Sequence, residues 1–440
     1  MPRLAGILAT AAALLAPARG AAQAAPAQRL TLAGAVQLAT ENAPAVHVAG
    51  YAADEARARV GEARSLLLPS LSLTGAWYNR SETLASFGLA APGFPAFISP
   101  FDNLDARLHF TQTVFDFSSW QHLRAEGFLR AGSAANRTAA VQEAARAAAL
   151  SYLRAVRAAS LLAARQADAD IAAQLLSLAE AQLQAGVSAP LDVTRARTQL
   201  VAAQGALLVA RNQRQKADID LALALGADPA TTYVLADTLT GDLGISSAPT
   251  DTVAALTLAL DRRPDLAAEA ATGERARAER LAVTSGLLPR VEFAADYGPN
   301  GKTLPTAFNT QDIALVVSIP LLDGLHREAR SDEQRAVEQE SRVREGDLRR
   351  RIAAQVRAAL LDLGSGIEQH GVAAQRLSLA GEELDEARER FASGVAGNID
   401  VINAQSSLNL ARDVEIDSRF ATAAARVSLA YAAAVAETIH

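Results

Sequence analysis

Cysteine is absent from the 440 residues, so the chain can form no disulfide and carries no lipid-modified N-terminal cysteine. Aromatic residues are scarce, at 5% of the chain, and they collect with glycine and proline at 69–120 and 286–325. The remainder is rich in alanine, leucine, arginine, glutamate and glutamine, which are good helix formers. The composition therefore predicts a mostly helical chain with two short interruptions.

Long hydrophobic runs are missing outside the N-terminus. Met1-Pro2-Arg3 precedes a largely apolar run, Leu4 to Ala16, and then the small residues Ala22-Gln23-Ala24-Ala25. A positive start, an apolar run and an A-x-A site are typical of a signal peptide, here predicted as 1–24. The run is too short to span a bilayer, and no later stretch has 18 uninterrupted apolar residues. The sequence thus predicts an exported chain.

An excess of positive charge is also lacking. The predicted signal peptide contains Arg3 and Arg19, so 42 basic residues less these two leave 40 against 48 acidic ones, a net charge of −8. A mildly acidic chain without a basic cluster argues against nucleic acid as a partner.

Signatures of enzymes, cofactors and metal sites are missing as well. Gly301-Lys302-Thr303 resembles the end of a phosphate-binding loop, but Asp296 occupies the position of its first glycine. The six histidines show no H-x3-H or similar ligand spacing. We therefore expect no enzymatic activity, no cofactor and no metal ligands.

The chain contains two copies of one pattern. A proline, a Leu-Leu-Pro segment 25 residues later, an aspartate, and a glycine 70 or 71 residues after it recur in the same order. These landmarks are Pro44, Pro69, Asp116 and Gly186 in the first copy and Pro264, Pro289, Asp323 and Gly394 in the second. Such self-similarity predicts two structural repeats, 25–245 and 246–440.

Apolar and polar residues alternate in two segments of each repeat, as Leu71, Leu73 and Trp77 illustrate. The predicted strands are 67–78, 104–115, 288–298 and 311–321, joined in pairs by loops at 79–103 and 298–310. Strands of about ten residues with one apolar face are typical of transmembrane β-barrels. Each alone also fits a half-buried strand of a soluble sheet. Four strands without a partner sheet need something apolar to face, and lipid is the simplest candidate.

Helices account for the rest of both repeats. The predicted helices are 31–65, 118–185 and 191–225 in the first repeat and 251–286, 325–393 and 399–436 in the second. The two long ones contain no proline and carry apolar rows such as Leu348, Ile352, Val356 and Leu360. A helix of 68 residues is about 100 Å long. The chain turns at Gly186 and Gly394, where a helix commonly ends in a left-handed residue.

Four strands cannot close a barrel, and an open edge in lipid leaves backbone groups unpaired. Other copies of the chain must therefore complete the sheet. Three copies give twelve strands, an even number within the known range for such barrels. The internal repeat then makes the helical part a quasi-sixfold ring, so the expected object is a continuous conduit.

Further motifs support this interpretation: Arg263-Pro264-Asp265-Leu266, Ile319-Pro320-Leu321-Leu322-Asp323-Gly324, and Gly394 followed by Asp400-Val401. With them the chain resembles, over about residues 28–438, the TolC family of outer-membrane efflux proteins. The resemblance implies an α+β membrane protein, a homotrimer whose β-barrel lies in the outer membrane of a Gram-negative cell. A long α-helical barrel would continue it into the periplasm.

The resemblance also implies a function and partners. The chain would form the passive exit duct of a tripartite efflux or type I secretion system. It would dock to a periplasmic adaptor protein and be driven by an inner-membrane pump. Drugs, toxic small molecules, metals or polypeptides would pass through it.

Site residues follow from the same resemblance, one position at a time. Gly186 and Gly394, with Val187 and Val395 after them, correspond to the periplasmic turns where adaptor hairpins dock. These turns form the predicted docking surface.

Asp400 corresponds to an acidic residue that rings the narrowest part of the pore, and Asn403 replaces its acidic companion. A carboxylate ring favours cations. Asp192 corresponds to an aspartate that helps to keep the tube shut, but Phe391 and Ala396 replace its usual tyrosine and arginine partners. The resemblance thus implies a pore constriction lined by Asp192, Asp400, Asn403 and Phe391. For both aspartates, helix N-capping after the turn is an equally weighted alternative.

A second function remains open at this point. A soluble periplasmic coiled-coil scaffold or adaptor would also contain long helical hairpins. Its strands would form one small domain around a single hairpin, whereas here two strand pairs each follow a helix in duplicated order. The channel is therefore the preferred interpretation.

Overall fold

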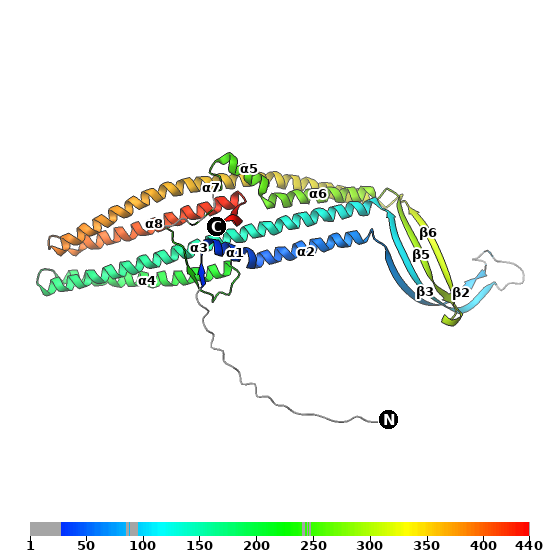
Figure 1. Ribbon diagram of the computed structural model, residues 1–440, viewed down its shortest axis with the longest axis horizontal. Helices are drawn as coiled ribbons and strands as arrows, with labels where there is room; N and C mark the ends of the chain where they lie inside the picture. The colour runs from blue at the N-terminus through cyan, green and yellow to red at the C-terminus, as the bar shows by residue number, and fades with distance from the viewer. Residues whose placement is uncertain are drawn as a thin grey trace, which may run out of the picture.

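The structure is a computed structural model that describes residues 28–84, 88, 96–239, 243, 245 and 248–439. The predicted signal peptide, 1–24, lies outside the described residues. The molecule is elongated, with a helical body and a four-stranded sheet at one end (Figure 1). The connections between long helices at 185–189 and 393–397 lie at the opposite end of the body (Figure 1).

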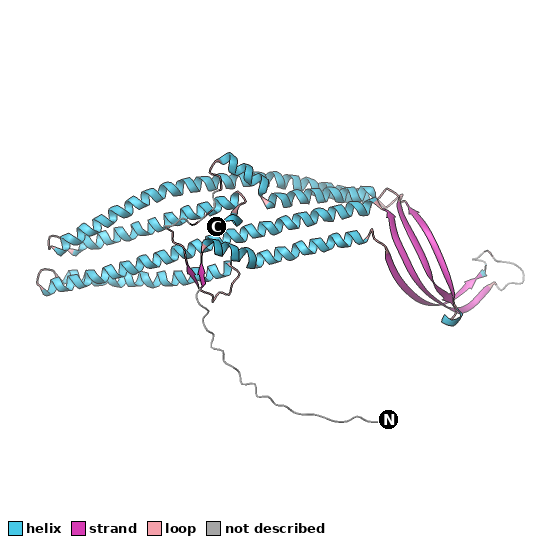
Figure 2. Ribbon diagram, viewed as in Figure 1, coloured by secondary structure: helices cyan, strands magenta, loops and turns pink. Residues whose placement is uncertain are grey.

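Within the described residues each repeat has four α-helices in the same order, and the long helices run along the long axis of the molecule (Figure 2). In the first repeat they are α1 (Leu32–Asn42), α2 (Pro44–Ser65), α3 (Phe117–Gln184) and α4 (Pro190–Ala224). In the second they are α5 (Thr252–Arg262), α6 (Pro264–Ser285), α7 (His326–Ala392) and α8 (Asn398–Ala432). Corresponding helices have 11, 22, 68 or 67, and 35 residues.

The helices predicted at 31–65 and 251–286 are not continuous. Each is broken by a proline, which becomes the first residue of α2 or α6. Proline has no N–H to donate and restricts the residue before it to extended conformations. Ala43 and Arg263 accordingly have ψ values of 130° and 116°. The predicted helix 399–436 also ends early, at Ala432, before a left-handed Ala434 with φ 59°.

The four-stranded sheet is antiparallel, with strand order β2-β3-β5-β6. Its strands are β2 (Ser70–Thr83), β3 (Phe97–Phe115), β5 (Arg290–Gly301) and β6 (Phe308–Ser318). The β3–β5 pairing joins the two repeats, and β2 and β6 form the edges. Gly298 lies where β5 meets β3, and a Cβ there would be 2.0 Å from the Ala106 carbonyl oxygen. Only glycine allows this close approach of two backbones.

All four strands run farther into the predicted loops than the alternation indicated, whereas β2, β5 and β6 stop two or three residues short at their other ends. β2 and β3 have 14 and 19 residues, so both run into the predicted loop 79–103. β5 reaches Gly301, and β6 begins at Phe308 and ends three residues before 321. Backbone pairing continues past the apolar segment, because a strand needs hydrogen-bond partners but not alternating side chains.

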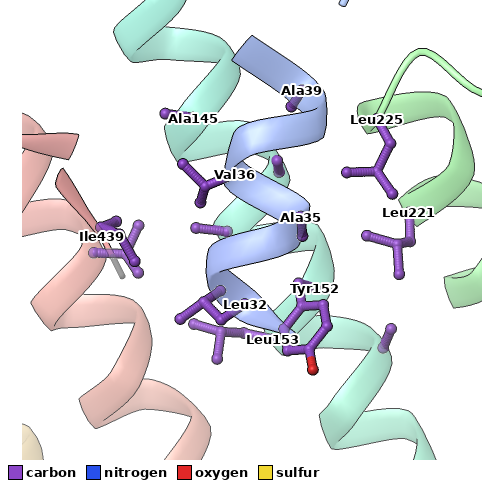
Figure 3. Close-up of a cluster of buried hydrophobic side chains, with 14 of the residues drawn as sticks. Leu32, Ala35, Val36, Ala39, Ala145, Tyr152, Leu153, Leu221, Leu225 and Ile439 are labelled. Carbon is purple, nitrogen blue, oxygen red and sulfur yellow. The ribbon is translucent and has the colours of Figure 1, made fainter. Parts of the chain in front are cut away.

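The main core lies midway along the body, where α1 packs against α3, α4 and the C-terminal segment (Figure 3). Small alanines dominate it, with Tyr152, Leu32 and Leu153 as the largest fully buried side chains. In α7, Ile352 and Val356 are fully buried in a second core against α5 and α8. Alanine at these positions lets helix backbones approach closely.

A short parallel pair, β1 (Gln28–Leu30) with β4 (Tyr233–Leu235), was not predicted. The Tyr152 hydroxyl lies 2.9 Å from both the Leu30 carbonyl and the Asp237 carboxylate, and Asp237 also accepts from the Leu32 N–H at 2.7 Å. Burial raises the pKa of Tyr152 above its usual range, so its hydroxyl remains a proton donor even in alkaline solution.

Candidate functional site

The two turns at the far end of the body have the same backbone geometry. Gly186 and Gly394 follow the long helices with φ values of 75° and 73°. The N–H groups of Gly186 and Val187 donate to carbonyls of the last turn of α3, each at 3.0 Å. Those of Gly394 and Val395 do the same for α7, also at 3.0 Å. This is the Schellman arrangement, which needs a left-handed residue and so favours glycine.

Each turn presents one exposed valine. Val187 is 71% exposed and Val395 73% exposed, although both are apolar and β-branched. The α3–α4 and α7–α8 hairpins therefore offer matched apolar contacts at the same end of the molecule (Figure 1). Adaptor docking at these turns stays a prediction.

The two predicted pore aspartates have different surroundings. The Asp192 carboxylate is 16% exposed, accepts from the Ala189 N–H at 3.3 Å and lies 3.7 Å from Arg195. It therefore caps α4. Asp400 is exposed in the first turn of α8 and makes no hydrogen bond or ion pair within the described part of the chain. The capping alternative thus applies to Asp192, while the Asp400 carboxylate faces solvent, as Asn403 does one turn later.

Phe391, predicted to line the pore, is instead 3% exposed. Its ring belongs to an apolar cluster with Leu384, Val401 and Leu408, which holds α7 against α8. The spacing of Leu384, Ala387 and Phe391 places all three on one face of α7, and this face is buried. Phe391 therefore belongs to the hairpin core and not to a pore wall.

Two amide side chains connect the hairpins at this end. Asn398, which is fully buried, donates from Nδ2 to the Asp192 carbonyl at 2.7 Å. Gln182 donates from Nε2 to the Phe391 carbonyl at 3.1 Å. No sequence pattern indicates these links, because their acceptors are backbone carbonyls. They join α3–α4 to α7–α8 without the tyrosine and arginine that the TolC resemblance implies.

A buried ion-pair network joins the hairpins farther along. Asp168 in α3 is 3% exposed and lies 2.9 Å from both Arg165 and Arg412, and Arg165 also pairs with Asp413. Arg412 and Asp413 belong to α8. Removing one partner from a buried pair typically costs about 3–5 kcal/mol, so this network opposes separation of α3 from α8.

The sheet at the other end separates apolar from polar side chains. Register aligns an apolar row across all four strands: Leu71, Phe110, Ala295 and Ile313. The neighbouring row is polar: Ser72, His109, Asp296 and Asp312. Because successive residues of a strand point to opposite faces, one face of the sheet is apolar and the other polar. Leu71 and Ile313 are 67% and 66% exposed, so none of the described residues covers the apolar face at these positions.

Comparison with known proteins identifies the family. The sequence model of the outer membrane efflux proteins matches residues 35–227 and 255–435, which is one match to each repeat. The chain belongs to this family. It is 28% identical over 397 residues to protein CyaE of Bordetella pertussis, covering 88% of this chain and 81% of CyaE.

Two further relatives agree with the outer membrane efflux family. The pyoverdine export outer membrane protein OpmQ of Pseudomonas putida is 26% identical over 267 residues, 58% of this chain. The match spans only 54% of OpmQ. The crystal structure of the CmeC outer membrane channel of Campylobacter jejuni superposes with a TM-score of 0.80 at 16% identity, covering 92% of this chain and 86% of CmeC.

Membership of the outer membrane efflux family confirms the predicted TolC resemblance, and the superposition confirms the fold. The chain is an outer-membrane efflux or secretion channel protein, with a sheet for the outer membrane and a helical extension for the periplasm. The alternative of a soluble periplasmic scaffold or adaptor is wrong.

Proposed function

We propose that three copies of the chain form one exit duct, through which an inner-membrane pump expels its substrate. The observation that carries this proposal is the open sheet, whose edges β2 and β6 each pair on one side only within the described residues. In lipid, each unpaired backbone group costs several kcal/mol. β2 of one copy pairing with β6 of the next removes both edges and gives a closed barrel.

The apolar row of the sheet supports lipid as its surroundings. In a barrel this face turns outward, and the row that contains His109, Asp296 and Asp312 turns inward. The lumen of the barrel is then wet and carries acidic groups from every copy.

The turns at the other end support a periplasmic adaptor as the partner. Val187 and Val395 are the exposed apolar groups of two equivalent turns, so a trimer presents six similar sites to adaptor hairpins. Gly186 and Gly394 keep these turns tight. The Asn398 and Gln182 bonds hold the hairpins together when no partner is bound.

The exposed Asp400 carboxylate supports a role in the pore. Three copies form a ring of negative charge, with the uncharged Asn403 one turn behind it. The name of the OpmQ relative, a pyoverdine export protein, suggests pyoverdine or a similar molecule as one class of cargo. The choice of cargo is left to the pump.

Imaging of the detergent-purified chain tests the assembly. We expect a threefold cylinder about 130 Å long, from about 100 Å of helix and about 30 Å of barrel. Monomers without a detergent belt would contradict the duct.

Reversal potentials in planar bilayers under a salt gradient test the role of Asp400. Asp400→Ala should reduce cation preference, whereas Asn403→Ala should leave it unchanged. An unchanged reversal potential in Asp400→Ala would remove this residue from the pore.

A further inference from the structure

A histidine and two glutamates meet between the two repeats, near the sheet. His122 and Glu126 lie one turn apart on α3, and Glu279 lies on α6. Their candidate ligand atoms are all within 4.8 Å of one another, and His122 Nδ1 is 3.1 Å from Glu279 Oε1. We propose that these three side chains form a binding site for a divalent transition metal ion such as Zn²⁺.

The carboxylate of Glu126 is buried but only partly paired by the surrounding protein. It is 6% exposed, and its Oε1 accepts from Arg275 Nη2 at 3.1 Å. Its Oε2 is buried and has no hydrogen-bond partner among the described residues. A buried carboxylate oxygen without a partner is costly, because the charge has lost its water. A cation held also by His122, which lines the same cavity, would remove this cost.

The charges also fit a divalent ion. Glu126 and Glu279 contribute two negative charges, neutral His122 contributes none, and Arg275 offsets only one. The cluster therefore has a net charge of −1 before an ion binds. Arg280, next to Glu279 in the chain, pairs instead with Glu338 at 3.3 Å, a carboxylate that Arg342 also contacts.

The geometry suits zinc. Zinc bonds of about 2.0–2.2 Å in a tetrahedral site place neighbouring ligand atoms about 3.4 Å apart. The His122–Glu279 separation of 3.1 Å is already close to this value, and the Glu126 ligand atom lies within 4.8 Å of the other two.

Water has access to the fourth position. His122 is 43% exposed and lies between two cavities, of about 720 and 370 Å³. The first lies between α2 and α3, and the second between α3, α6 and α7. An ion can therefore enter hydrated and keep a water ligand, as zinc sites with three protein ligands do.

The site would fasten the two repeats together. α3 and α6 are the inner helices of the layer α2-α3-α6-α7, so the site lies within one protomer. A metal bridge from α3 to α6 would hold the helical body rigid just below the β3–β5 joint.

Zinc binding to the full-length, tag-free protein in detergent tests the proposal. After treatment with a chelator, Zn²⁺ is titrated in competition with a chromophoric chelator, and Co²⁺ is used as a spectroscopic probe. We expect one ion per chain, the visible absorption of tetrahedral Co²⁺, and a Tm that rises with free Zn²⁺.

Three variants make the result specific. His122→Gln and Glu279→Gln should weaken zinc binding at least about tenfold. His47→Gln, an exposed histidine on α2, should bind as the parent does. His122→Gln is the decisive variant, because its partly exposed side chain can be replaced without unfolding the chain, which the Tm without zinc verifies. Parent protein that binds no zinc, or His122→Gln that binds as tightly as the parent, would overturn the proposal. Neither result bears on whether the chain forms a duct.

Discussion

Asn398→Ala is expected to loosen the two hairpins at their turns. The buried amide donates to the Asp192 carbonyl at 2.7 Å, and alanine removes this bond, although the carbonyl keeps its helix hydrogen bond within α4. Loss of one such side-chain hydrogen bond costs about 0.5–1.5 kcal/mol net. Since about 1.4 kcal/mol corresponds to a tenfold change in an equilibrium constant, separated hairpins become about 2- to 12-fold more populated. The Gln182 bond and the Asp168 network remain, so the chain stays folded.

Conductance and distance measurements check this prediction. In planar bilayers Asn398→Ala should stay open for a larger fraction of the time, because closure depends on the joined hairpins. The chain has no cysteine, so Val187→Cys with Val395→Cys provides two unique sites for spin labels. The distance between the labels should lengthen or broaden in the Asn398→Ala background.

Asn403→Ala is the matched control. It removes an exposed asparagine from the same helix without touching the other hairpin. If Asn398→Ala and Asn403→Ala show the same conductance and the same label distances as the parent, the amide link does not hold the hairpins together.

Two further substitutions test the fold. Gly298→Ala places a Cβ 2.0 Å from the Ala106 carbonyl oxygen. This clash should destabilise the β3–β5 pairing by about 3 kcal/mol or more and prevent assembly. In the control Gly75→Ala, in β2, the new Cβ meets nothing within 4 Å, so this variant should assemble normally. Heat-dependent migration on detergent gels distinguishes the two, and an assembled Gly298→Ala would show that β3 and β5 do not approach as described. Burial disfavours ionisation of Asp265, but hydrogen bonds and the charge of Arg263 outweigh it and hold the pKa of Asp265 below its usual range. Ionised Asp265 therefore stabilises the fold above about pH 4, and this contribution is lost as pH falls through its lowered pKa. Asp265→Asn should have a lower Tm than the parent at pH 7, and the two Tm values should converge in acid. The exposed residue Asp261 provides the control variant, Asp261→Asn. A Tm difference between Asp265→Asn and the parent that does not change with pH would contradict this assignment.

The large-scale organisation could be predicted because it depends on patterns within each repeat. Proline spacing, two-residue alternation and long proline-free stretches are all visible along the chain. The breaks before Pro44 and Pro264 were missed although the prolines themselves served as landmarks of the repeat. A proline is tolerated in the first turn of a helix, and this rule would have marked both as helix starts. The three-residue strands β1 and β4 are too short to show a period.

The residues at the helical turns and in the proposed metal site were harder to predict, because they meet only in the folded chain. Phe391 stands where the resemblance implies a tyrosine, yet its burial depends on how α7 packs against α8. His122 and Glu126 have the one-turn spacing of a helical ligand pair, which was available in the sequence. Glu279, the third member, is 157 residues from His122, and only the α3–α6 packing brings it near.

The open sheet also affects how variants behave in a cell. A barrel closed by β2 of one copy and β6 of the next gives every chain two neighbours, so a single defective edge breaks the ring. When normal and defective chains are made together, the share of intact ducts in the proposed three-copy assembly falls with the cube of the normal fraction. A damaged β6 would therefore act as a dominant mutation, although the helical body of each chain is normal.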